Sequence, residues 1–165
     1  MKRLYVSIER CSGCRACEMA CSVAHEGKFG TSLSRIRVAK LETSGIDAPV
    51  VCRQCSNAPC AKVCPVGAIS VSQNTGAKTV DPVLCIGCGA CVEACPFGAM
   101  SLHPEDGRAI VCDLCDGNPR CVERCPLDAL RYEDALSRAA NKGAATARAM
   151  SGPVLKKWGI GGEGR

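Results

Sequence analysis

Sixteen cysteines fall into four groups of four, and this repeat constrains the fold more than any other feature of the sequence. The first and third groups have the spacing C-x2-C-x2-C-x3-C, whereas the middle gap widens to four residues in the second group and to five in the fourth. In chain order, motifs 1 to 4 consist of Cys11, Cys14, Cys17, Cys21; Cys52, Cys55, Cys60, Cys64; Cys85, Cys88, Cys91, Cys95; and Cys112, Cys115, Cys121, Cys125. Motifs 2 to 4 end in the related segments CPVGAI, CPFGAM and CPLDAL, but Cys21 is followed by Ser22.

Chains this rich in cysteine are disulfide scaffolds, zinc proteins or iron–sulfur proteins. Disulfides need an oxidising compartment. The sequence starts MKRLYVSIERC, and its apolar stretch from Leu4 to Ile8 is too short for the core of a signal peptide. The chain also lacks a run of about 18 apolar residues. We therefore expect a cytoplasmic location, free thiols and no membrane span.

Zinc is the main competitor for the CxxC pairs, but zinc sites usually use two separated pairs. They need neither a third cysteine two residues on nor a Cys-Pro after three more. Four such motifs predict four [4Fe–4S] clusters, each held by four of the sixteen cysteines. A zinc-binding interaction or nucleic-acid module is the alternative of another class and would be colourless. A cysteine-rich metal store is a third possibility and would lack reversible one-electron redox steps.

Composition agrees with an interior filled by clusters. The chain has one Trp, two Tyr and two Phe, so large side chains for an ordinary core are scarce. The formal charge of +5 treats every Cys as neutral. Each cluster with its four thiolates carries about 2−, which makes the loaded protein about 3−. A basic pI therefore does not predict nucleic acid as a partner. The last segment, residues 131–165, carries seven basic and three acidic side chains, a positive stretch.

The motifs have the signature of bacterial ferredoxins, in which three cysteines lie on a tight loop around one cluster. The fourth is expected to open a short helix and to reach the neighbouring cluster. Strands are expected at residues 3–8 and 35–41, with hairpins formed by residues 68–72 with 79–80 and by 99–103 with 109–111. The expected fold class is α+β: two bacterial-ferredoxin-like modules with short helices and β-hairpins, plus a C-terminal helical tail.

With these motifs, the chain resembles the four-cluster polyferredoxin subunits that serve molybdenum and tungsten pterin enzymes and some hydrogenases. The iron–sulfur subunit of dimethyl sulfoxide reductase is the broad type. The stretches 21–38 and 112–126 are most similar to the small subunit of bacterial tungsten aldehyde oxidoreductases. Members of the broader family often have a longer gap inside motif 4, which this sequence lacks. The resemblance covers residues 1–132, expected as one tandem four-cluster domain, and leaves 133–165 as a tail.

The resemblance implies that motif 1 pairs with motif 4 and motif 2 with motif 3. Each ligand set then takes three cysteines from the motif of the same number and the last from its partner. Ligand sets 1 to 4 are Cys11, Cys14, Cys17, Cys125; Cys52, Cys55, Cys60, Cys95; Cys85, Cys88, Cys91, Cys64; and Cys112, Cys115, Cys121, Cys21. Pairing of adjacent motifs, as two separate beads, is the alternative.

The resemblance also implies a non-catalytic electron-transfer subunit. The sequence holds no Ser-His-Asp set, P-loop or GxGxxG, so substrate chemistry would belong to a partner. The implied partner is the catalytic subunit of a tungsten- or molybdenum-pterin aldehyde oxidoreductase. Electrons would leave to a flavin- or NAD-linked subunit, a ferredoxin or another copy of the chain. A ferredoxin-like subunit of a hydrogenase or formate-linked complex is the alternative.

A role can also be expected for a few other residues. With sixteen cysteines for four clusters, His25 and His103 are not needed as ligands and are expected in ordinary loop or surface roles. Arg15 beside motif 1 could raise its cluster's potential, and Asp113 and Asp116 could lower theirs, unless solvent screens them.

The tail is expected to form a helix over residues 133–149, which are rich in Ala and place acids before bases. Ser151-Gly152-Pro153 would end it. Beyond it, Val154, Leu155 and Trp158 beside two lysines suggest an arm that docks on an acidic subunit, against the plainer reading of a frayed terminus.

Overall fold

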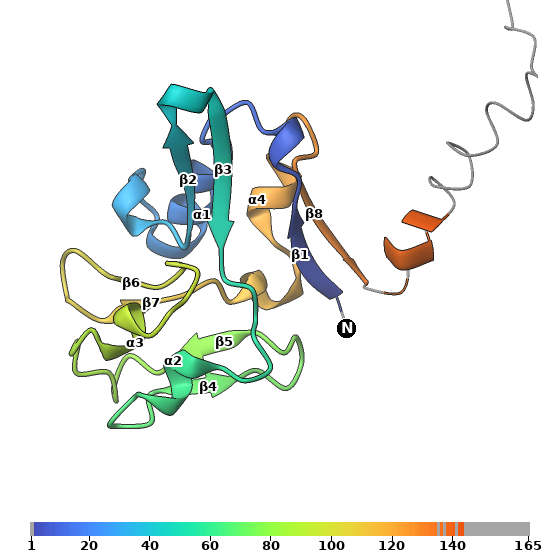
Figure 1. The fold of residues 1–165 in the computed structure, drawn as a ribbon. Coiled ribbons are helices and arrows are strands. Elements are labelled where there is room, and N and C mark those ends of the chain that lie inside the picture. The colour runs from blue at the N-terminus through green and yellow to red at the C-terminus, as the bar shows by residue number, and fades with distance from the viewer. Residues whose placement is uncertain (1, 135, 137, 141, 144–165) are drawn as a thin grey trace, which may run out of the picture. The chain divides into compact units, whose positions relative to one another are not determined.

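The computed structural model describes residues 2–134, 136, 138–140 and 142–143. The chain divides into two units, Met1–Tyr132 and Glu133–Arg165. The first unit contains all sixteen cysteines and is a mixture of short helices and four two-stranded sheets (Figure 1). The α+β expectation is therefore confirmed for this part of the chain.

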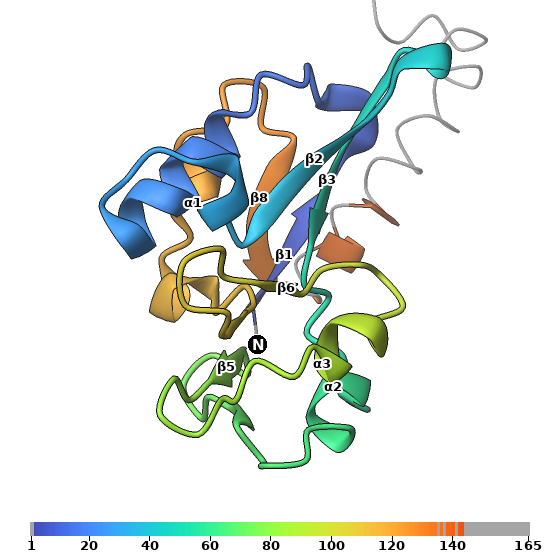
Figure 2. The ribbon, with the colours of Figure 1, turned by 90° about the vertical axis from the view of Figure 1, so that its left-hand side faces the viewer.

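The first unit consists of two modules, which separate in both views (Figures 1 and 2). The first module, drawn uppermost, holds motifs 1 and 4. It contains β1 (Lys2–Val6), α1 (Ala16–Glu26), β2 (Ile36–Leu41), β3 (Ile46–Val51), α4 (Arg120–Glu123) and β8 (Leu130–Asp134). Its 3-10 turns are η1 (Ile8–Arg10), η2 (Thr31–Leu33), η3 (Glu42–Ser44) and η4 (Leu114–Gly117). Strands β1 and β8, from opposite ends of the unit, pair with each other, which closes this module.

The second module holds motifs 2 and 3 and repeats one plan twice. Its elements are α2 (Pro59–Lys62), β4 (Ile69–Val71), β5 (Lys78–Val80), α3 (Ala90–Glu93), β6 (Ser101–Leu102) and β7 (Ala109–Ile110). Both predicted hairpins are confirmed, with Ile69 opposite Val80 and Ser101 opposite Ile110. Their turns are alike: the N–H of Ser72 donates to Ala77 O over 2.8 Å, and the N–H of His103 to Arg108 O over the same distance.

Among the strands of the first module, the expected segments 3–8 and 35–41 correspond to β1 and β2. The partner of β2 was not predicted. β3 runs antiparallel to β2, with Ile36 opposite Val51 and Leu41 opposite Ile46. It includes Pro49, and a proline within a strand weakens the pattern by which strands are recognised.

The placement of the helices corrects one expectation. The fourth cysteine does not open a short helix in any motif. In motifs 2 to 4 the helix begins one residue before the third cysteine, and the fourth lies two residues beyond the helix end. In motif 1 the helix α1 continues through Cys21 to Glu26. A proline after Cys21 would remove an internal hydrogen bond of this helix, which explains why motif 1 has Ser22 there.

The interior of the first unit contains few large side chains. Only Ile36, Leu114 and Leu130 among the large apolar residues are as little as 1% exposed. Cysteines make up much of both core clusters: Cys17, Cys21, Cys112 and Cys121 in one, Cys60 and Cys91 in the other. The core is thus built around cysteine sulfurs.

The tail is described only in part. Residues 133 and 134 belong to β8, so the helix expected from 133 begins later; residues 136, 138–140 and 142–143 are helical. The proposed docking residues Val154, Leu155 and Trp158 lie outside the described residues. Among the helices that the structure describes, none is both long enough and apolar enough to cross a membrane.

Candidate iron–sulfur centres

Each motif loop turns through residues with positive φ, which let a short chain curl around one point. They are Gly13 and Arg15 in motif 1, Gln54 and Ala58 in motif 2, Gly87 and Gly89 in motif 3, and Leu114 to Gly117 in motif 4. At Gly87 the need for glycine is also steric, because a Cβ would lie 2.7 Å from the carbonyl oxygen of Gly107. Successive backbone N–H groups of such loops point inward and favour a negatively charged group.

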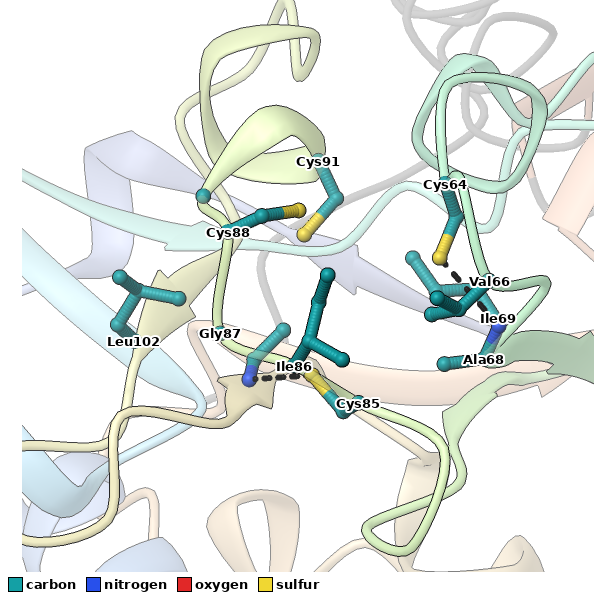
Figure 3. A pocket seen from close by; sticks show the side chains of 12 residues that line it. Cys64, Val66, Ala68, Ile69, Cys85, Ile86, Gly87, Cys88, Cys91 and Leu102 are labelled. Carbon is teal, nitrogen blue, oxygen red and sulfur yellow. Dashed lines mark hydrogen bonds between the residues drawn. The ribbon is translucent and has the colours of Figure 1, made fainter.

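Three pockets each have the four cysteines of one ligand set in their walls. They belong to set 1, set 2 and set 3, and each opens to solvent. Figure 3 shows the pocket of set 3, where the sulfurs of Cys85, Cys88 and Cys91 and that of Cys64 point toward the same space. In all three, the fourth sulfur comes from the partner motif that the resemblance named. None of these pockets joins cysteines of motifs 1 and 2.

The cysteines of set 4 are the most deeply placed. Cys21, Cys112 and Cys121 are buried in one core cluster. Burial raises the pKa of the Cys121 thiol, and the nearby Cys112, Cys21 and Cys115 add to the rise. Burial is likewise the main cause that raises the pKa of Cys115, with Asp113 and Cys21 contributing.

Hydrogen bonds to sulfur explain the CPxxA segments. The N–H groups of Ala68, Ala99 and Ala129 donate to the sulfurs of Cys64, Cys95 and Cys125 over 3.3, 3.4 and 3.2 Å. Before each alanine stands a residue with positive φ, namely Gly67, Gly98 and Asp128. In motifs 2 to 4 the turn therefore aims one backbone donor at the last cysteine. Cys21, which lies within a helix, instead accepts from the N–H of Arg35 over 3.3 Å.

These observations test whether the sites suit an iron–sulfur cluster. Each set offers four sulfurs with backbone donors beside them, which is the donor chemistry of a [4Fe–4S] cluster. All sixteen cysteines lie in the described part of the chain, and all are free of disulfide bonds. Burial raises the pKa of Cys17 and of Cys112 to about 12, so the metal-free thiols are neutral at physiological pH. Cluster binding must displace those protons.

Neighbouring sets approach one another in a definite order. Cys17 of set 1 lies in one core cluster with Cys21, Cys112 and Cys121 of set 4. Cys60 of set 2 lies in the other cluster with Cys91 of set 3, and Cys52 of set 2 packs against both clusters. This packing links set 1 to 4, set 4 to 2, and set 2 to 3. The two exposed cysteines of the chain, Cys14 and Cys88, belong to sets 1 and 3 at the two ends of this series.

Some residues around the centres differ from expectation. The histidines were expected in loop or surface positions. His103 does lie in the loop after β6, but its side chain is 5% exposed; His25 is in α1 and its side chain is 13% exposed, so neither is a surface residue. Arg15 is partly exposed, with its Nε 3.9 Å from a carboxylate oxygen of the buried Glu18. Gln54 is buried between the modules. Its role was not predicted, because a single glutamine forms no recognisable sequence pattern.

Comparison with known proteins gives a consistent result. The profile of the 4Fe-4S dicluster domain family matches residues 45–135, which include motifs 2 to 4. The profile of the 4Fe-4S binding domain family matches residues 8–24, which include motif 1.

The chain is similar to curated proteins named as electron carriers. It is 47% identical over 116 residues to the polyferredoxin-like subunit of the aliphatic sulfonate oxidoreductase of Pyrococcus furiosus, covering 69% of this chain and 66% of the relative. It is 38% identical over 113 residues to the thiosulfate reductase electron transfer subunit PhsB of Salmonella typhi, covering 65% and 58%. The chain thus spans about two thirds or less of the length of these relatives.

A solved structure has a similar fold. The active site complex BamBC of benzoyl coenzyme A reductase, bound to 1,5-dienoyl-CoA, includes a chain that is 27% identical, with a TM-score of 0.50 over 81% of this chain and 75% of that one.

Proposed function

The chain belongs to the 4Fe-4S dicluster domain family, and on that premise we propose that it is a non-catalytic electron-transfer subunit of an oxidoreductase complex. It binds several [4Fe–4S] clusters. We assign four, one to each ligand set, with all sixteen cysteines as ligands. Each cluster would supply reversible one-electron chemistry, while the chain's own residues fix its position and surroundings.

The observation that carries this proposal is the grouping of cysteines. Sulfurs from motifs far apart in sequence line common pockets in fours, as with Cys125 beside Cys11, Cys14 and Cys17. Backbone donors already point at the last ligand of each motif. A store of metal would not need such donors, whereas a redox centre uses them to stabilise its negative charge.

The order of the sets supports a relay. Electrons would enter at one end, pass through sets 1, 4, 2 and 3 or the reverse, and leave at the other. The exposure of Cys14 and Cys88 fits this, because only the terminal centres need to approach a partner. Neither middle set has an exposed cysteine, which limits loss of electrons to solvent oxidants.

The partner is inferred from the relatives. Their names, the sulfonate oxidoreductase subunit above all, support a catalytic oxidoreductase subunit as the electron donor or acceptor. We propose that it carries a tungsten or molybdenum pterin and oxidises aldehydes. At the other end we propose a flavin- or NAD-linked subunit, a ferredoxin or a further copy of this chain.

The relay is tested on the full chain, reconstituted or purified without oxygen. We expect about sixteen irons and sixteen sulfides per chain, no zinc, and paramagnetic signals on stepwise reduction. A colourless chain with zinc would overturn the proposal. The ligand sets are tested with Cys21→Ser, which should alter the cluster of set 4 and leave that of set 2 unchanged.

The partner is tested separately, by anaerobic co-purification of the native protein followed by metal analysis of the complex. Tungsten or molybdenum in an amount equal to the catalytic subunit supports the pterin partner. Nickel and iron in a co-purified subunit would favour a hydrogenase instead.

A further inference from the structure

In the part of the chain that the structure describes, one ligand sulfur lies within hydrogen-bond distance of a side-chain nitrogen. His25 Nε2 lies 3.6 Å from Cys115 Sγ. The two residues are far apart in the sequence: His25 lies in the last turn of α1, and Cys115 lies in η4 of motif 4. The His25 ring is largely buried, with 13% of its side chain exposed, so water competes little for this contact.

The surroundings of His25 determine which ring nitrogen carries hydrogen. Its Nε2 is also 3.5 Å from Asp113 Oδ1. That carboxylate is itself held in place, since its Oδ1 accepts from the N–H of Cys115 over 2.9 Å and its Oδ2 from Arg35 Nη1 over 2.5 Å. Once Cys115 binds iron, its sulfur and the carboxylate oxygen can both only accept, so the hydrogen lies on Nε2, which donates. This holds for the neutral ring and for the cation alike.

The other sulfur contacts are of a different kind. Among the hydrogen bonds in the part of the chain that the structure describes, the remaining donors to ligand sulfurs are backbone N–H groups. They belong to Gly13, Arg35, Ala68, Ala99, Ala109 and Ala129. Set 4 is therefore distinguished from sets 1, 2 and 3 by a donor that a point substitution can remove without touching the backbone.

We propose that His25 is a positioning residue that raises the reduction potential of the set 4 cluster through the hydrogen bond from Nε2 to Cys115 Sγ. This rests on the ligand sets of the proposed function. Reduction adds one electron to the cluster and makes no bond and breaks none, and the hydrogen stays on His25. The added negative charge is shared by the cysteine sulfurs, and a donor to one of them stabilises the reduced form more than the oxidised form. The carboxylate of Asp113, 3.5 Å from the same nitrogen, favours the hydrogen on Nε2.

The test uses the full chain with its four clusters and follows each reduction step by EPR during a redox titration. In His25→Phe, which keeps a ring but has no donor, we expect one of the four steps to shift. Its reduction equilibrium constant should fall roughly tenfold, which is ~59 mV lower for a one-electron couple. The other three steps should stay in place. His25→Gln, whose amide can still donate, should keep the potential of that step close to its wild-type value.

The matched control is His103→Gln, since His103 is the other histidine of the chain and contacts no described ligand sulfur. It should leave all four steps unchanged. Unchanged potentials in His25→Phe, or equal shifts of all four steps, would overturn the proposal. Too few irons in the wild-type chain would instead reject the four-cluster assignment itself.

A second measurement covers the case in which His25→Phe loses a cluster. Wild-type chain with ¹⁵N-labelled histidine is reduced and studied by pulsed EPR. A weak coupling of one histidine nitrogen to one cluster, absent in His25→Gln, supports the hydrogen bond. The absence of any coupling, or a strong coupling that indicates direct ligation to iron, contradicts it.

Discussion

Gln54 Nε2 donates a 2.6 Å hydrogen bond to the backbone carbonyl of Cys112. The contact joins motif 2 to the first ligand of motif 4, and so links the two modules. The other end of the same amide, Oε1, accepts from the N–H of Lys78 over 2.8 Å. Gln54 is 6% exposed, so both partners depend on it rather than on water. At this junction Cys52 of set 2 packs against the core cluster that contains Cys112 of set 4.

Gln54→Ala should therefore destabilise the junction. It leaves a buried carbonyl and a buried N–H without partners, which costs roughly 1–3 kcal/mol of the free energy of unfolding. The measurement is anaerobic urea unfolding of the loaded chain, followed by the visible absorbance of the clusters. Gln73→Ala, at an exposed turn position, is the matched control and should change little. Equal stability of the two variants would show that Gln54 contributes nothing at the junction.

A second contact between the modules should matter much less. Lys28 Nζ lies 2.9 Å from Glu105 Oε1, but the two side chains are 62% and 61% exposed. Water and salt screen such a pair, so it contributes little to the free energy of unfolding. We expect Glu105→Gln to change the urea midpoint only slightly, and less at high salt. A loss of stability in Glu105→Gln as large as that in Gln54→Ala would mean that burial does not determine the strength of these contacts.

The turns before the sulfur-directed N–H groups allow a paired prediction. Gly98 has φ 58° and a Cβ there would meet nothing within 4 Å, so Gly98→Ala costs only backbone strain, about 1–2 kcal/mol. Asp128, at the same place in motif 4, already bears that strain with φ 49°. Asp128→Gly should therefore be neutral or stabilising, because its exposed ion pair with Arg10 is worth little. Urea unfolding of both variants gives the comparison, and destabilisation by Asp128→Gly would contradict it.

Much of the fold follows from local pattern. The spacing of the cysteines predicts compact motifs, and the alternation after Cys64 and Cys95 predicts two hairpins, which the structure contains. The CPxxA segments are visible in the sequence as a repeat, but their role is not. The N–H groups of Ala68 and Ala99 point at sulfur because of the backbone conformation of the residue before them, which only the structure shows.

What the sequence does not reveal are contacts between distant segments. β3 was not predicted because Pro49 interrupts its pattern. Its pairing with β2, more than its own residues, makes this segment a strand. His25 and Gln54 are single polar residues, and no sequence pattern marks either of them as a contact residue. Their roles arise because the fold brings Cys115 and Cys112 beside them, 90 and 58 residues away in the chain.

Removal of iron should make stability depend on pH in a particular direction. Burial raises the pKa of Cys112 to about 12 in the metal-free fold, whereas an ordinary thiol has a value near 9.0. Below pH 9 the thiol is neutral in both states, and the folded chain bears no penalty. Between pH 9 and 12 the unfolded chain loses this proton and the folded chain keeps it, so stability falls as pH rises. For Cys112 alone the loss reaches ~4 kcal/mol by pH 12.

The measurement compares the chelator-treated chain with the loaded chain by far-UV circular dichroism and urea unfolding at pH 7, 9 and 10.5. The metal-free chain should be less stable at every pH, because its core lacks the groups around which the cysteines pack. Its urea midpoint should fall steadily above pH 9. The loaded chain is the control and should change little over this range, since its ligands have already lost their protons on binding iron. A metal-free midpoint that stays constant from pH 7 to 10.5 would show that these thiols are not buried as the structure has them.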